Sequence, residues 1–145
     1  MKKLGLIFLI LVFIFIGCGN KAESPFSPEI KPRAVLTISM QYEPVAFIYN
    51  AWLASWCIDN CIILVETNGV GGNINFMKAE MMYQGLVGET KNFAENYNFN
   101  ARESMSGCDF DCTIYEYDEM KVTVQGTDNN GYAINVSRTF DVYYQ

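Results

Sequence analysis

Hydrophobic and polar residues alternate along much of the chain from residue 34 onward. The alternation has a period of two in segments 36–41, 120–125 and 134–144. Successive side chains of a β-strand point to opposite faces, so this period predicts half-buried antiparallel strands. Arg138 falls among the apolar positions of the last segment, and it marks either a β-bulge or an edge where a charge is tolerated.

Three further segments are also predicted to be extended. Residues 61–66 form a continuous run, CIILVE, that is typical of a strand buried on both faces. Aromatic residues spaced through 93–99 indicate another strand. Residues 77–82, MKAEMM, have helical propensity. Their neighbours favour a strand, so we predict a strand with a bulge near residues 76–77 and keep a helix as the alternative.

Turn sequences separate the predicted strands. TNGVGGN at 67–73 and GTDNNG at 126–131 each contain an Asn-Gly pair, and both residue types tolerate the positive φ that hairpin turns require. About seven strands are expected in residues 34–145, a normal size for one domain with its own core. The sequence therefore predicts an all-β fold, an antiparallel β-sandwich.

Two stretches resemble known β-sandwich domains. EMKVTVQGTDNNGYAINVSRTFDVYY resembles the last two strands of immunoglobulin-like and fibronectin-III-like domains, and ILVETNGVGGNINF resembles their second-to-third strand hairpin. The resemblance implies an immunoglobulin-like β-sandwich over residues 34–145. The Cys…Trp…Cys spacing of true immunoglobulin domains is missing, because Trp52 and Trp56 precede both cysteine pairs.

The N-terminus has the features of an export signal. Lys2 and Lys3 precede an apolar run over residues 4–17, which is shorter than the about 20 residues of a membrane-spanning helix. The junction Phe-Ile-Gly-Cys at 15–18 resembles the lipobox of bacterial lipoproteins. This resemblance implies cleavage that removes signal peptide 1–17, and acylation of Cys18 by palmitate and other acyl chains, which would anchor the protein stably in a membrane.

Residues 18–33 contain three of the four prolines and no apolar period, so we expect an extended tether. Loss of the two signal-peptide lysines leaves 8 basic and 16 acidic side chains, a net charge of about −8. This acidic balance argues against binding to nucleic acid and to anionic lipid headgroups. Membrane contact is therefore expected only through the lipid.

Five cysteines are present, and assigning Cys18 to lipid leaves two Cys-x₃-Cys pairs, Cys57/Cys61 and Cys108/Cys112. Four cysteines in an exported protein are typical of two disulfides. A zinc site is one alternative, but an oxidising compartment favours pairing of the thiols. Thiol redox catalysis is another, but it usually needs Cys-x-x-Cys spacing and no nearby carboxylates.

The pairing of these four cysteines depends on the fold. Residues four apart on a strand are roughly 13 Å apart, so local bridges Cys57–Cys61 and Cys108–Cys112 require a turn inside each motif. The immunoglobulin-like resemblance implies instead two loops at the same end of the sandwich, with Cys57 bonded to Cys112 and Cys61 to Cys108. Loop entropy also favours long links. We therefore favour the nested pairing, and the local pairing stays open.

Motifs for catalysis are missing. The chain has no histidine, which excludes Ser/His/Asp and Cys/His arrangements, and a carboxylate-based hydrolase is only a remote alternative. No cofactor is expected. One acidic group is a weak candidate for calcium, although such charges are usually only solvated; its members are Asp109, Asp111, Glu116, Asp118 and Glu119.

Four aromatic residues, Tyr42, Tyr49, Trp52 and Trp56, precede the first cysteine pair. We expect them to pack over the end of the sandwich, and an exposed contact surface is the alternative.

These observations lead to an expected function. We expect a lipid-anchored, extracytoplasmic, non-enzymatic protein with a binding, adhesion or structural role in the cell envelope. The partner would be a protein or a surface polymer. An accessory subunit of an envelope secretion or transport assembly is the alternative. Gly19 stands where enteric lipoproteins retained at the inner membrane have Asp, which favours the outer membrane or cell surface.

Overall fold

Strands alone form the regular structure of the described residues. The computed structural model describes residues 29–93 and 96–145, apart from the side chains of 109–111. Its strands are β1 (Leu36–Met40), β2 (Val45–Asn50), β3 (Ser55–Glu66), β4 (Gly72–Tyr83), β5 (Leu86–Phe93), β6 (Tyr97–Phe99), β7 (Ser104–Thr113), β8 (Glu119–Asp128) and β9 (Ala133–Tyr144). In this part of the chain, no helix is long and apolar enough to cross a membrane.

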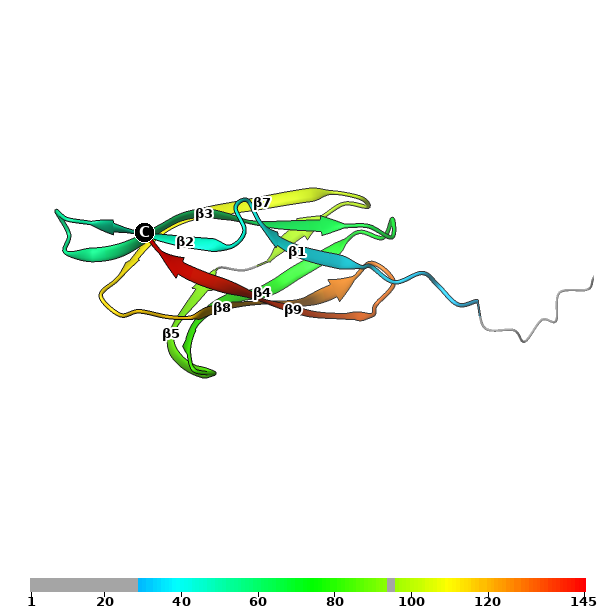
Figure 1. Cartoon of the computed structure of the whole chain (residues 1–145). Coiled ribbons are helices and arrows are strands. Elements are labelled where there is room, and N and C mark those ends of the chain that lie inside the picture. The colour runs from blue at the N-terminus through cyan, green and yellow to red at the C-terminus, as the bar shows by residue number, and fades with distance from the viewer. Residues whose placement is uncertain (1–28, 94–95) are drawn as a thin grey trace, which may run out of the picture. The chain divides into compact units, whose positions relative to one another are not determined.

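The strands pair in the order β1-β3-β2-β9-β8-β4-β5, with β7 added to β3 and β6 added to β4 (Figure 1). In the described part of the chain, every strand pairing is antiparallel except that of β2 with β9, which is parallel. Strand β2 therefore joins two groups, one around β3 and one around β4 and β8. The prediction of an all-β, mainly antiparallel fold is confirmed, whereas the parallel pair was not foreseen.

The core lies between these two groups of strands. Phe47, Val45, Val122 and Val124 are the largest apolar side chains that are almost fully buried. They come from β2 and β8, and every second residue of β1 and β3 packs with them. Each such side chain contributes roughly 1.5–3 kcal/mol by leaving water. The period-two pattern of the sequence therefore marks the face of each strand that holds the fold together.

The structure corrects the predicted number and extent of strands. Residues 29–93 and 96–145 contain nine strands where about seven were expected, because β2 and β3 extend the sheet before residue 61. Residues 61–66 have one buried and one half-buried face, so burial on both faces was wrong. Residues 77–82 are strand, as predicted, within β4. The register of β4 against β8 shifts between Ile74 and Phe76, next to the predicted bulge.

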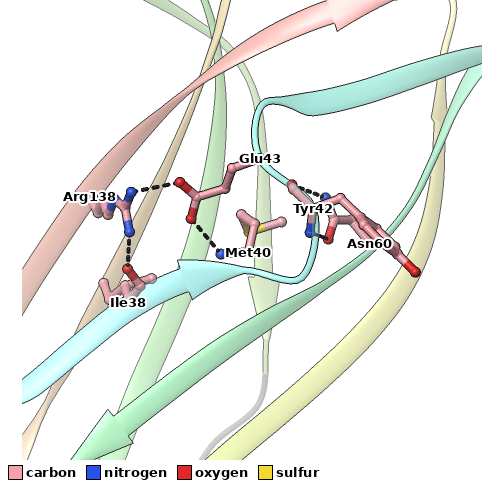
Figure 2. A network of polar contacts seen from close by, with 6 residues as sticks. All are labelled: Ile38, Met40, Tyr42, Glu43, Asn60 and Arg138. Atoms are coloured by element: carbon pink, nitrogen blue, oxygen red, sulfur yellow. Dashed lines mark hydrogen bonds and ion pairs between the residues drawn. The ribbon is translucent and has the colours of Figure 1, made fainter.

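Arg138 occupies an edge rather than a bulge. The β8–β9 register passes Arg138 without a shift. Its guanidinium donates to the carbonyl oxygen of Ile38 at 2.8 Å and to the Glu43 carboxylate at 2.7 Å (Figure 2). On the other side of the loop between β1 and β2, the Asn60 side-chain amide pairs with the backbone N–H and C=O of Tyr42. The polar groups therefore fix the loop that carries the chain from β1 to β2.

Candidate binding site

Two disulfides join β3 to β7, one near the start of β3 and one in its middle. Cys57 lies directly opposite Cys112, and Cys61 lies opposite Cys108. The Cα atoms are 4.1 Å and 4.0 Å apart, and both pairs are bonded. This is the nested pairing that we favoured. The expectation that the cysteines lie in loops was wrong, because both motifs are extended strand.

The disulfides lie on the face of β3 that points away from the core. Ile58, Ile62 and Leu64 alternate with the cysteines and are buried in the core. Asp59 falls between the two cysteines of β3 and is exposed. Cys57 lies two residues before Asp59 and Cys61 two residues after it, and both are cross-linked to β7. The backbone at Asp59 is therefore held by a covalent bond on each side. The cross-linked part of β3 and β7 is therefore a rigid support for the segments that project from it.

A hairpin projects from this support between β2 and β3. The side-chain oxygen of Asn50 accepts the N–H groups of Trp52 at 3.0 Å and Leu53 at 3.2 Å, so the turn is closed by its own side chain. Ala54 has a φ of 47°, which completes the reversal. Trp52 is 97% exposed and Leu53 is 58% exposed. We call Ile48, Tyr49, Trp52 and Leu53 the hairpin tip.

The aromatic residues before the first cysteine divide into two roles. Trp56 is partly buried and packs edge-on against Tyr49 and Tyr144, with ring centroids 5.1 Å and 4.8 Å apart. Tyr42 and Trp52 are exposed, and Tyr49 is half-exposed. The expectation that all four pack over the sandwich is therefore wrong for Tyr42 and Trp52. The hairpin tip is instead an exposed apolar surface, and no Asp, Glu, Lys or Arg occurs between residues 44 and 58.

Two turns of the same sequence pattern lie near the start of β1. They are 66–69 and 128–131, and each reads acid, any residue, Asn, Gly. Their glycines have φ of 78° and 87°, values that glycine adopts freely. In each turn the carboxylate accepts the backbone N–H of the asparagine, at 2.8 and 2.9 Å. We call them the twin turns.

The twin turns hold four consecutive backbone groups of the incoming chain. Their asparagine side chains donate to the carbonyls of Pro32 and Arg33, at 2.7 Å each. Their carboxylates accept the N–H groups of Ala34 and Val35, at 3.0 and 3.3 Å. Pro32 and Arg33 thus belong to the compact unit, which spans Lys31–Gln145.

Both carboxylates of the twin turns are buried and ionised. Burial alone would raise the pKa of Glu66, but four backbone N–H donors outweigh it and hold that pKa below 4.5. Burial likewise opposes ionisation of Asp128. Three backbone N–H groups and the Arg33 guanidinium overcome it and lower the pKa of Asp128 below 3.8. Sequence reasoning missed both residues as structural sites, although the shared pattern was a usable signal.

A small cavity of about 90 Å³ opens between β5 and β7. Its walls are mostly apolar, and at its rim the Thr113 hydroxyl donates to Glu89 at 2.9 Å. Burial, together with a hydrogen bond to Glu89, raises the pKa of Tyr117 to about 12. This phenol therefore keeps its proton at neutral pH and acts as a donor. Through Glu89, the arrangement ties β5 to the end of β7 and to Tyr117.

The remaining predicted sites are not brought together. Glu116, Asp118 and Glu119 are exposed or half-exposed, and one Asp118 oxygen accepts the N–H of Gln84. Asp109 and Asp111 lie on β7, but their side chains are outside the described part. Within the described residues no group of three acids, cysteines or histidines could hold a metal ion. The lipidation site Cys18 and the signal peptide also lie outside the described residues.

Comparison with known proteins gives a fold and no family. No family model and no curated protein match the sequence. The crystal structure of a Bordetella pertussis protein provisionally named ApaA is similar, with a TM-score of 0.54 and 7% identity. The match covers 76% of this chain and 95% of that chain. Fold and disulfides thus define an all-β protein whose two bridges indicate an oxidising, extracytoplasmic environment.

Proposed function

We propose that this protein is a lipid-anchored binding module of the bacterial cell envelope, and that its hairpin tip contacts the partner. One observation carries the proposal: an exposed aromatic hairpin lies at the opposite end of β3 from the segment where the N-terminal chain enters. β3 spans Ser55–Glu66, roughly 36 Å at 3.3 Å per residue. Within this body, the tip therefore lies at the far end of β3 from residues 32–35, where the chain enters β1 (Figure 1).

The strand pairing supports an immunoglobulin-like sandwich as the scaffold. In that fold the first strand crosses from one sheet to the other, pairing antiparallel with the second strand and parallel with the last. Here β2 pairs antiparallel with β3 and parallel with β9. The pairs β4–β8 and β8–β9 supply the opposite sheet. Such domains present loops and hairpins at their ends as contact surfaces.

The role is non-catalytic in this proposal. The hairpin tip offers apolar contact area and no reactive group. Large rigid aromatic side chains such as those of the tip supply much of the binding energy at protein interfaces. Exposed aromatic patches on otherwise polar surfaces are commonly interaction sites.

The anchor is tested on Cys18. Wild-type protein and a Cys18→Ser variant are expressed in a diderm bacterium with labelled palmitate. We expect a mature wild-type N-terminus at Cys18 that carries acyl chains, and an unprocessed, unlabelled variant. An unmodified Cys18 or an intact signal segment in the wild type contradicts the anchor.

The binding role is tested on the tip. Wild-type protein and a Trp52→Ala variant are displayed on cells and cross-linked in the native envelope. We expect Trp52-dependent adducts, with a Leu86→Ala variant as the control, because Leu86 is also a largely exposed apolar residue but lies on β5. Adducts that are identical in all three proteins would overturn the role of the tip.

A further inference from the structure

An open hollow lies beside the hairpin tip on the disulfide face. It has a volume of about 430 Å³, and its lining includes Ile48, Asn50, Trp52, Cys57 and Asp59. Trp52, which is exposed, is among the lining residues, as is Cys57 of the disulfide Cys57–Cys112. The hollow therefore combines an apolar wall with polar groups at fixed positions.

The polar groups of the hollow are free to bind a ligand. The Asn50 oxygen is used by the turn, but its side-chain N–H₂ has no partner among the described residues. Asp59 makes no hydrogen bond or ion pair in the same part of the chain, and it is exposed. The hollow thus offers one donor group and one strong acceptor next to an aromatic face.

Charge narrows the class of ligand. Among the described residues, the lining of the hollow contains no Lys or Arg, and its one acidic residue is Asp59. The whole chain is also acidic, with a net charge of −6. Anionic ligands are therefore repelled. The electron-rich face of an indole attracts the weakly positive C–H groups of a sugar ring, and carboxylates and amides pair with hydroxyls.

We propose that this hollow binds a neutral carbohydrate, with Trp52 stacking on a sugar ring and Asp59 and Asn50 bonding its hydroxyls. The inference rests on the proposed function and names the partner of the same tip. The two disulfides fix the backbone of β3 on either side of Asp59, and the Asn50 side chain fixes the backbone of the turn at Trp52. A site fixed in this way loses little conformational freedom on binding.

The test uses the full-length protein in a detergent without a sugar headgroup. Maltotetraose, cellotetraose and N-acetylchitotetraose are the neutral probes, and heparin is the anionic probe. Binding is measured by calorimetry and by the change in tryptophan fluorescence. We expect at least one neutral probe to bind, Trp52→Ala to weaken it about tenfold or more, and Asp59→Asn to weaken it several-fold. Leu86→Ala serves as the matched control and leaves binding unchanged.

Three results would overturn the inference: no neutral probe binds at millimolar concentration, heparin binds better than every neutral probe, or Trp52→Ala binds as wild type does. Trp52 is almost fully exposed, so the Trp52→Ala variant keeps the wild-type melting temperature. If envelope adducts still depend on Trp52 while all sugars fail, the tip binds a protein. The carbohydrate inference then falls and the binding module stands.

Discussion

Replacing Glu66 by Gln should strongly lower the free energy of unfolding, because this carboxylate accepts four backbone N–H groups at 2.8–3.3 Å. Each bond to a buried charged group contributes about 1.5–3 kcal/mol. Gln keeps one accepting oxygen and points an N–H₂ group at two of the donors. Two bonds are therefore lost, and we expect Glu66→Gln to lower the unfolding free energy by about 3–5 kcal/mol. For a body of this size that corresponds to a melting temperature roughly 12–20 °C lower.

The same substitution has a predicted pH dependence. The folded pKa of Glu66 lies below its ordinary value of 4.5, so its stabilisation is complete above that pH and disappears as the pH falls through the folded pKa. The difference between wild type and Glu66→Gln should therefore be largest at neutral pH and shrink in acid. Urea unfolding followed by tryptophan fluorescence measures both. Glu29→Gln is the control, since Glu29 is exposed. A Glu66→Gln loss below about 1 kcal/mol at neutral pH would refute the reasoning.

Three other perturbations have expected outcomes. Replacing the pair Cys61–Cys108 by Ala should lower the free energy of unfolding by about 3 kcal/mol, and removing both bridges should lower it by about 7 kcal/mol. The first cross-link removes most of the conformational entropy of the unfolded chain, whereas the second closes only a short ring. If the losses from the two single removals, measured in urea, sum to the loss from the double removal, this reasoning is wrong. Gly126→Ala should lower the free energy of unfolding by about 3 kcal/mol in urea, since its Cβ would lie 2.1 Å from a carbonyl oxygen of β4. Gly107→Ala should change it little, because its Cβ would meet nothing within 4 Å. Equal losses of stability in the two variants would exclude the clash. Arg138→Lys should cost about 1 kcal/mol in thermal unfolding, because Lys lacks the second donor branch, and an unchanged melting temperature would show that the loop holds without it.

The period of the apolar residues predicted the class of fold because each strand faces the core with every second residue. This held for β1, β8 and β9, where burial alternates. It could not predict β2, because its parallel pairing with β9 joins residues nearly a hundred positions apart. Pairing of that range depends on how the whole sheet closes, which no local pattern encodes.

The sequence reasoning predicted which cysteines are bonded, but it did not predict that they lie on paired strands. We placed the motifs in loops because the immunoglobulin-like resemblance implies two loops at the same end of the sandwich. A separate argument was that residues four apart on a strand are too distant for a local bridge. That argument excludes local bridges in strands and says nothing against cross-strand ones. In the structure the antiparallel register sets Cys57 against Cys112, and four residues later it sets Cys61 against Cys108. Equal spacing in two antiparallel strands was itself the signal, since only equal spacing lets both pairs align.

The exposure of Trp52 depends on the turn that the Asn50 side chain closes. Aromatic residues before a cysteine pair usually pack, and Trp56 does so against Tyr144. Trp52 differs because Asn50 accepts two N–H groups of the turn and thereby places the indole at the apex of a hairpin. An Asn two residues before a Trp is a weak signal in sequence. It becomes decisive only when the strands on either side are known to pair.

The twin turns extend this argument from one residue to a pair of motifs. Residues 66–69 and 128–131 share a pattern, and each alone reads as an ordinary hairpin turn. Their common role arises because β3 and β8 end at the same side of the body, where the chain enters β1. A force applied through an N-terminal anchor would reach these hydrogen bonds first, before it reached the core.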